Sequence, residues 1–233
     1  MALKDEIREQ RKSLKGKGIK AHISWFVTYY GMTVVLGIIA SIILIYFLYT
    51  VFTAKKQGFG IVMINASSLD LFTESDAGEE LASAFSEYAG IDPNKETVLA
   101  DLNERLDISE DMDYQTVERI FALSASNQLD VLTADPEVYD YYSGAQTFED
   151  LRNFLTEEEL SYFEKNSLLY YSDSKDSDGN VVETHVPTGV YCTGSEALSR
   201  VDAFEEKECI TGIIAGSLHP DRAVLFIKYL TGT

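Results

Sequence analysis

The chain has 233 residues, with 19 Lys and Arg against 38 Asp and Glu, a formal net charge of −19, and 45% of its residues are hydrophobic. This share of apolar residues excludes an intrinsically disordered chain, and two cysteines cannot form the disulfide framework of a small secreted scaffold. Because a protein of this sign is repelled by phosphate, we expect no nucleic acid partner.

The charge is divided between two unequal regions. Residues 1–56 hold nine Lys and Arg and three Asp and Glu, a sum of +6, whereas residues 57–233 hold 10 and 35, a sum of −25. Between the two charged regions lies an uncharged run, 23–54, with an apolar core of 22 residues at 31–52. About 20 apolar residues cross the hydrocarbon core as a helix, and no polar face interrupts this run. We therefore predict a transmembrane helix, with the lipid bilayer as a partner.

The flanks of this run predict its orientation. Seven basic residues precede it and two follow it, which places the N-terminus in the cytoplasm by the positive-inside rule. The acidic region is then extracytoplasmic, on a cell membrane. A cleaved signal peptide is the alternative, but its apolar region would be shorter, and Thr50–Ala54 is a poor cleavage site, so an uncleaved anchor is favoured. The basic residues are Lys4, Arg8, Arg11, Lys12, Lys15, Lys17 and Lys20 before the run, and Lys55 and Lys56 after it.

Strand and helix patterns alternate after the apolar run. Ile61–Ile64 is a compact apolar segment, typical of a buried strand. Asp76, with Glu79 three residues later, predicts a capped helix that Gly90 ends. The next segment, Val98–Ile108, is apolar at alternate positions and favours a second strand, although several of its residues also fit a helix.

The second half of the chain continues this alternation. The expected elements are a helix from Asp113, a strand at Leu129–Thr133, a helix capped by Asp135 with Pro136 at its first position, short helices with cap signals at Thr147 and Thr156, a β-hairpin of Leu168–Tyr171 with Val181–Val186, a strand at Cys209–Ile214 and a closing helix from Pro220.

These patterns predict an α/β fold. We expect a largely parallel sheet covered by helices, with a β-hairpin insertion, following the N-terminal transmembrane helix. The expected organisation is a cytoplasmic basic segment at 1–22, a transmembrane signal-anchor helix at 23–54, a linker at 55–60 and an extracytoplasmic α/β domain at 61–233.

Three segments resemble a known family. Leu129–Asp135 resembles the strand and turn of the extracellular solute-binding proteins of ABC transporters, the type 2 periplasmic-binding-protein class. Tyr139 and Thr147–Leu155 resemble the capped-helix pattern that follows there. Gly212–Ser217 together with Ala223–Leu230 resembles the closing strand and helix of that class.

The order of elements also agrees with that family over most of residues 60–233. The departures are clear: these receptors are usually two-lobed, longer, and tethered by lipid or free. The resemblance therefore implies a reduced or single-lobe, membrane-anchored version.

The resemblance implies a ligand site at the carboxyl ends of strands, where open α/β sheets bind ligands. After the first strand these residues are Asn65, Ser67 and Ser68. After the third they are Thr133 and Asp135, with Tyr139 nearby. Hydroxyl and amide groups suit a small polar solute, since they orient it by hydrogen bonds. Ordinary turn and cap residues are the alternative interpretation of the same side chains.

No catalytic or metal motif accompanies this site. His22, His185 and His219 have no metal-ligand spacing, and there is neither a nucleophile elbow nor a phosphate loop. The acidic hairpin turn at 174–180 lacks the first and twelfth ligands of a calcium loop. We expect no metal, no cofactor and no enzymatic activity.

The two cysteines form a separate prediction. Cys192 and Cys209 both follow the predicted anchor, so they lie in a compartment that permits disulfides. A bridge between them is favoured over two buried thiols.

Together these features predict a binding protein that acts as a sensor or transport accessory without catalysis. The alternative is an extracytoplasmic protein-interaction or envelope scaffold domain with a vestigial cleft and a membrane protein as partner.

Overall fold

The computed structural model describes residues 18–53, 55–66, 76–108, 114–176, 178–205 and 207–233. The chain divides into two units, residues 1–54 and 55–233.

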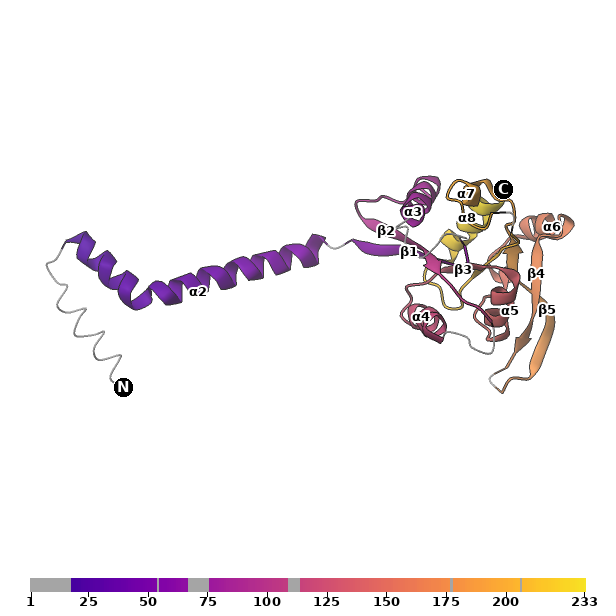
Figure 1. Ribbon diagram of the computed structural model, residues 1–233, viewed down its shortest axis with the longest axis horizontal. Helices are drawn as coiled ribbons and strands as arrows, with labels where there is room; N and C mark the ends of the chain where they lie inside the picture. Colours follow the sequence, from indigo (N-terminus) through magenta and orange to yellow (C-terminus); the bar gives the residue numbers. More distant parts are fainter. Residues whose placement is uncertain (1–17, 54, 67–75, 109–113, 177, 206) are drawn as a thin grey trace. The chain divides into compact units, whose positions relative to one another are not determined.

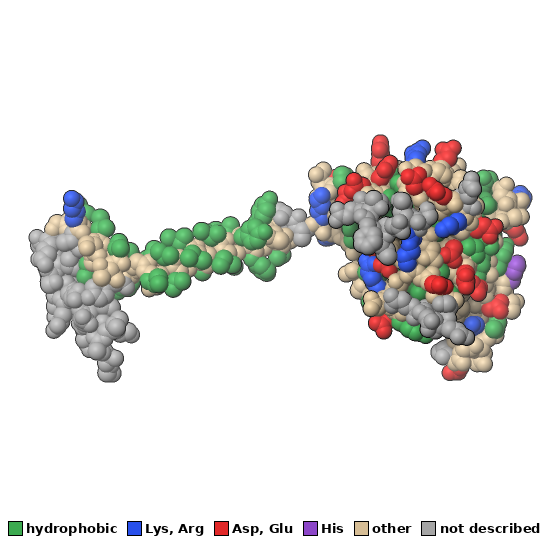
Figure 2. All heavy atoms as spheres, in the orientation of Figure 1, with side chains coloured by type: hydrophobic (Ala, Val, Ile, Leu, Met, Phe, Trp, Pro, Cys, Tyr) green, Lys and Arg blue, Asp and Glu red, His purple; other side chains and the backbone are tan. Residues whose placement is uncertain are grey.

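The first unit contains one long helix, α2 (Ile19–Thr53). Its window Tyr30–Val51 is 22 residues with a mean hydropathy of 2.6, none of it buried within the protein. Hydrophobic side chains cover the visible face of this part of the helix (Figure 2). The helix is therefore long and apolar enough to cross a membrane. It begins a few residues before the predicted span and includes Lys20.

The second unit is built on one six-stranded sheet of order β2-β1-β3-β6-β5-β4 among the described residues (Figure 1). Parallel pairing joins β1 to β2 and to β3, whereas β6 is antiparallel to both β3 and β5, and β4 is antiparallel to β5. The strands are β1 (Lys56–Ile64), β2 (Glu96–Glu104), β3 (Val131–Ala134), β4 (Leu169–Lys175), β5 (Val181–Tyr191) and β6 (Ile210–Ile213).

The sheet is therefore mixed, and the expectation of a largely parallel sheet holds for only half of it. β4 and β5 pair antiparallel, as the hairpin signal indicated, but they do not form a separate insertion. Val190 and Tyr191 of β5 pair with Thr211 and Ile210 of β6, so the hairpin extends the main sheet. This pairing is non-local, which is why turn residues could not show it.

Helices cover both faces of the sheet (Figure 1). Alternate residues of β1 point to opposite faces: Phe59, Ile61 and Met63 belong to one apolar cluster, and Val62 and Ile64 to the other. A strand covered on both sides is apolar at nearly every position, as Ile61–Ile64 is. The helices are α3 (Ala77–Tyr88), α4 (Tyr114–Ala125), α5 (Pro136–Gly144), α6 (Glu157–Lys165), α7 (Glu196–Ser199) and α8 (Pro220–Thr231), with a 3-10 turn η1 (Leu151–Asn153).

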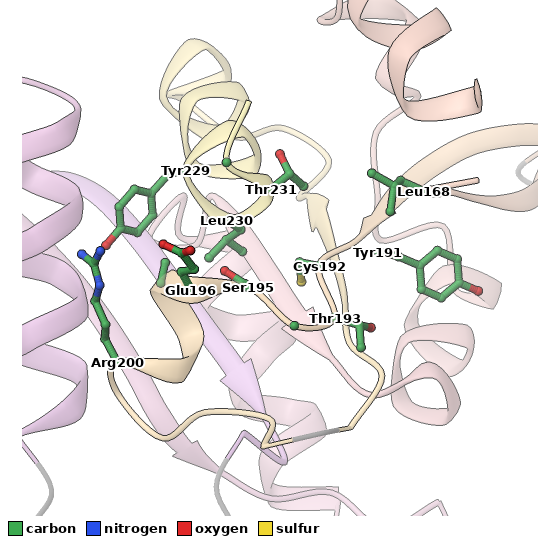
Figure 3. Close-up of a pocket in the computed structure, with 13 residues that line it drawn as sticks. Leu168, Tyr191, Cys192, Thr193, Ser195, Glu196, Arg200, Tyr229, Leu230 and Thr231 are labelled. Carbon is green, nitrogen blue, oxygen red and sulfur yellow. The ribbon is translucent and has the colours of Figure 1, made fainter. Parts of the chain in front are cut away.

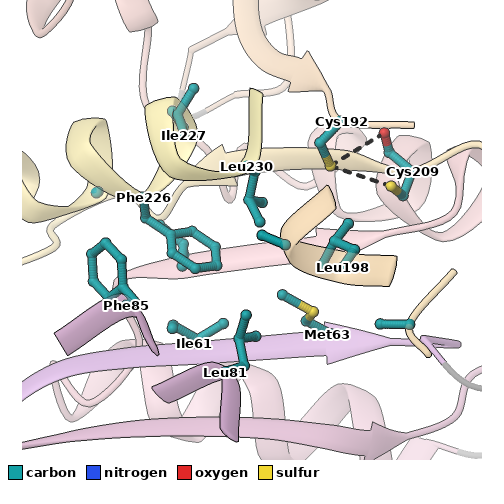
Figure 4. Packing of buried hydrophobic residues seen from close by; sticks show 14 of the residues in the cluster. Ile61, Met63, Leu81, Phe85, Cys192, Leu198, Cys209, Phe226, Ile227 and Leu230 are labelled. Atoms are coloured by element: carbon teal, nitrogen blue, oxygen red, sulfur yellow. Dashed lines mark hydrogen bonds between the residues drawn. The ribbon is translucent and has the colours of Figure 1, made fainter. Parts of the chain in front are cut away.

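The first face is packed mainly by α3, α7 and α8. Phe85 of α3 and Phe226 of α8 meet edge to face, with ring centroids 5.0 Å apart, above Phe59 of β1. Figure 4 shows this apolar layer between the helices and the strand. On the opposite face α4 and α5 contribute Val117, Ile120, Val138, Tyr139 and Tyr142.

Most local signals at helix ends are confirmed. The Asp135 carboxylate accepts from Val138 N at the start of α5, and Thr156 with Glu159 forms a reciprocal capping box on α6. Gly90 and Gly232 have left-handed backbones after α3 and α8. The cap predicted at Asp76 makes no side-chain bond, and Asp150 rather than Thr147 caps η1. The predicted helix start at Asp113 lies outside the described residues.

Candidate functional site

Several strands end at the same edge of the sheet, and we call this edge the carboxyl edge because the carboxyl ends of β1, β2 and β3 lie there. Ile64 of β1 lies opposite Glu104 of β2 on one side and Ala134 of β3 on the other, so three parallel strands end together. Because β6 is antiparallel, it begins at this edge, and β5 ends there. β2 lies on one side of β1 and β3 lies on the other, so the order of the strands reverses direction between β1 and β3. Such a reversal is called a switch point, and open α/β sheets bind ligands there.

Asn65 and Asp135 meet at this switch point. Asn65 Nδ2 donates to Asp135 Oδ2 at 2.7 Å, while Asp135 Oδ1 accepts from Val138 N at 3.0 Å. The Asn65 amide also exchanges hydrogen bonds with the backbone of Leu106 after β2. Its backbone has φ of 59°, a conformation that Asn tolerates better than most residues. This one amide therefore ties together the ends of three strands.

The other predicted ligand residues are placed differently. Thr133 is completely buried and its hydroxyl donates to Thr211 Oγ1 of β6 at 3.0 Å. Tyr139 is also completely buried, where its hydroxyl donates to Thr188 O at 2.8 Å and its ring stacks on Phe148. Burial raises the pKa of Tyr139. Ser67 and Ser68 lie outside the described residues.

Two cavities lie at the carboxyl edge, in the part of the chain described by the structure. Neither is lined by Asn65, Thr133, Asp135 or Tyr139, so the predicted ligand residues do not form their walls. One of about 320 Å³ is walled by the end of β5, the turn before α7 and the end of α8, and Figure 3 shows its lining. The other, of about 560 Å³, is walled by α7 and the segment leading to β6. Gly194 and Ser195 line both cavities. The second cavity borders the end of β1, because Phe204 N donates to Ala66 O.

The smaller cavity combines hydroxyl groups with one guanidinium, that of Arg200, and one carboxylate, that of Glu196. Arg200 and Tyr229 reach toward one another across one wall (Figure 3). Burial raises the pKa of Tyr229, with the charge of Arg200 acting in the opposite direction. The Ser195 hydroxyl accepts from Leu198 N, and the Thr193 hydroxyl accepts from Cys209 N. Such a lining offers orienting hydrogen bonds and one charge of each sign to a polar ligand.

These cavity residues were missed by sequence reasoning. Gly194 and Ser195 form a local signal, since Gly supplies a left-handed turn, with φ of 74°, and Ser caps the following helix. That signal predicts α7. It carries no information about the end of α8, whose residues Tyr229–Gly232 complete the wall of the smaller cavity.

The two cysteines lie between these cavities. Cys192 lines the smaller cavity and Cys209 the larger one. Both are free thiols in this structure, with the Sγ atoms 3.2 Å apart. The contact with Cys209, together with burial, raises the pKa of the Cys192 thiol.

A second polar cluster lies at the opposite edge of the sheet. Asp130, just before β3, is 1% exposed, and its carboxylate accepts from Gly60 N, Ser217 Oγ and His219 Nδ1 at 2.8, 2.6 and 3.2 Å. The Ser217 hydroxyl is directed to the carboxylate rather than to the imidazole, unlike the order of a catalytic triad. The cluster ties β1, β3 and the start of α8 together.

Comparison with known proteins identified no relative. No family model, no curated protein and no solved structure matches the chain significantly. The α/β fold and the carboxyl edge with its two cavities are therefore the observations from which a function is inferred.

Proposed function

We propose that this protein is a single-pass, membrane-anchored extracytoplasmic binding protein. It holds a small polar solute at the carboxyl edge and acts as a sensor or transport accessory without catalysis. The observation that carries the proposal is the presence of two cavities, of about 320 and 560 Å³, at the same edge of the sheet as the Asn65–Asp135 switch point.

Two further features support a solute-binding role. The segments Leu129–Asp135 and Gly212–Ser217, which resemble the solute-binding proteins of ABC transporters, contribute β3 and β6, the neighbours at the centre of the sheet. Hydroxyls, Glu196 and Arg200 line the smaller cavity, whose polar groups suit a hydrophilic ligand.

The anchor and its orientation are part of the proposal. Asp and Glu side chains dominate the charged groups visible on the domain in Figure 2, and the basic flank of 1–22 favours a cytoplasmic N-terminus. An acidic domain of this kind is suited to remain soluble beside a membrane.

The orientation is tested by thiol labelling in intact spheroplasts with a membrane-impermeant maleimide. Asp178→Cys, at the exposed hairpin tip, is expected to label directly, whereas Ser13→Cys is expected to label only after permeabilisation. Unmutated protein is the control, because Cys192 and Cys209 are buried. Direct labelling of Ser13→Cys with protection of Asp178→Cys would overturn the proposed topology.

Solute binding is tested by thermal unfolding of the full chain in detergent micelles against a panel of amino acids, small sugars and inorganic anions. A solute at about one hundred times its Kd adds about 2.7 kcal/mol, which raises the Tm by roughly 5–10 °C for a domain of this size. Arg200→Gln is expected to weaken the shift by an anionic solute, whereas Lys165→Gln on α6 is the matched control.

A panel that produces no shift would contradict solute binding and favour the scaffold function. The exposed apolar pair Val181 and Val182 on the hairpin, 51% and 68% exposed, is the feature that favours a protein partner. Cross-linking in membranes from Val182→Cys would then capture one dominant partner.

A further inference from the structure

The pairing of β5 with β6 places the two cysteines opposite each other. Val190 pairs with Thr211 and Tyr191 with Ile210, so the next position along this register joins Cys192 to Cys209. Cys192 N donates to Cys209 O at 3.0 Å, which continues the ladder by one bond. The second backbone bond of such a pair is not made, because Cys209 N donates to Thr193 Oγ1. Directly opposite residues in antiparallel strands have Cα atoms about 4.5–5.5 Å apart, within the range of about 4.4–6.8 Å that a disulfide requires.

The surroundings of the sulfur atoms are apolar and closed. Cys192 and Cys209 are 3% and 0% exposed, and both belong to the cluster that contains Leu198 of α7 and Leu230 of α8. Figure 4 shows the pair at the margin of this cluster. A disulfide at this position is shielded from reductants. Because the thiolate is the species that reacts, oxidation is favoured before the segment packs, during folding outside the cytoplasm.

The chain between the cysteines forms the walls of the candidate site. The segment 193–208 carries α7 and supplies Gly194, Ser195 and Arg200 to the cavities. Apart from apolar packing, its described attachments include Cys209 N to Thr193 Oγ1 and Phe204 N to Ala66 O. A covalent link at its base would restrict the opening of this segment.

We propose that Cys192 and Cys209 form a disulfide that restrains segment 193–208 and thereby the walls of both cavities. The statement that this restraint serves ligand binding rests on the proposed function. In the reaction each cysteine loses its thiol proton and one S–S bond forms between the two sulfurs. The two electrons pass through a mixed disulfide to a second disulfide, held by a thiol–disulfide oxidoreductase, which leaves as a dithiol.

The first test determines the thiol state of the full chain. Cells expressing the protein are lysed directly into a denaturant that contains an alkylating reagent, so that buried thiols also react, and the protein is analysed by mass spectrometry without reductant. The expected result is an unalkylated 192–209 pair linked as one peptide. Alkylation of both cysteines in protein whose orientation places them outside the cytoplasm would overturn the proposal.

The second test measures the restraint. Oxidised full chain in detergent micelles is compared with the Cys192→Ala/Cys209→Ala variant under limited trypsin digestion. Cleavage after Arg200 is expected to be roughly tenfold slower in the oxidised protein, because cleavage needs local opening, and the Tm roughly 5–10 °C higher. Cleavage after Lys175 in the hairpin is the control site and is expected to be equal in both forms.

Equal rates of cleavage after Arg200 in the two forms would overturn the proposal that the disulfide restrains segment 193–208, even where the disulfide is present. Thiol-state analysis of the same samples separates this outcome from incomplete oxidation. Failure of the solute panel in both forms would contradict the proposed function alone, since the protease readout needs no ligand. The two failures are therefore distinguishable.

Discussion

Replacing Asp130 with Ala is expected to lower the Tm of the domain at 55–233 by roughly 6–12 °C, equivalent to about 3 kcal/mol. Asp130 is 1% exposed, and its two oxygens accept from Gly60 N, Ser217 Oγ and His219 Nδ1. Removing the carboxylate leaves the buried Gly60 N–H without its acceptor, which costs about 1–3 kcal/mol. Ser217 and His219 are partly exposed, so water replaces part of the hydrogen bonds that they lose. The measurement is thermal unfolding of the full chain followed by near-UV circular dichroism.

Two variants make this result specific. Asp130→Asn is expected to recover part of the loss, because its oxygen can accept from Gly60 N while the Ser217 hydroxyl and the His219 imidazole reorient toward the amide nitrogen. Asp178→Ala, at the exposed hairpin tip, is the matched control and is expected to change stability by less than about 0.5 kcal/mol. A Tm for Asp130→Ala within 2 °C of the control, on the scale of about 2–4 °C per kcal/mol, would contradict the structural role of this cluster.

Replacing Gly212 with Ala is expected to cost about 2 kcal/mol, or roughly 4–8 °C in Tm. A Cβ at this position in β6 would overlap the Tyr139 hydroxyl and approach Phe148 Cδ1 to 2.8 Å and Thr188 O to 2.9 Å. Adding a methyl group to a core that is already filled forces its neighbours out of place. The same unfolding experiment measures the effect.

The overlap predicts a partial rescue. Tyr139→Phe removes the atom nearest to the added methyl group, so the double variant is expected to be more stable than the sum of the single effects by about 1 kcal/mol. Gly144→Ala is the control, since nothing lies within 4 Å of its added Cβ and Ala favours the helix. Strict additivity of Gly212→Ala and Tyr139→Phe would show that the two residues do not compete for this space.

The role of Tyr139 illustrates where sequence reasoning stops. Because Tyr139 follows the third strand, the family resemblance implied that it is a ligand residue. The residues next to it in the sequence are compatible with that interpretation. In the structure it occupies space left by Gly189 of β5 and Gly212 of β6, where an added Cβ at either position would meet the Tyr139 hydroxyl. These glycines follow it by 50 or more positions along the chain, and no local pattern connects them.

Asn65 and Asp135 illustrate the opposite case. Each follows an apolar strand directly, and the carboxyl ends of neighbouring parallel strands meet at one edge. The strand positions and the parallel pairing of β1 with β3 are therefore enough to predict that these two side chains lie close together. The 2.7 Å hydrogen bond between Asn65 and Asp135 agrees with this prediction.

By itself, the sequence determined the features that depend on neighbours along the chain. These are the long apolar helix, the C-terminal half of β1 at Ile61–Ile64, the cap at Asp135, the capping box at Thr156 and the hairpin of β4 with β5. The predicted linker at 55–60 is wrong, because β1 begins at Lys56 and pairs with β2 from there. The sequence also shows that the net charge of −19 is the sum of a basic N-terminal segment and an acidic domain. Periodicity, cap chemistry and composition act over a few residues, so a single chain displays them.

Only the tertiary structure decided what depends on pairing between distant segments. The position of β6 between β3 and β5 makes the sheet mixed, joins the hairpin to it and sets Cys192 opposite Cys209. The cavity walls combine the turn before α7 with the end of α8 for the same reason. Strand order is selected by the burial of both sheet faces under helices, a property of the whole domain rather than of any segment.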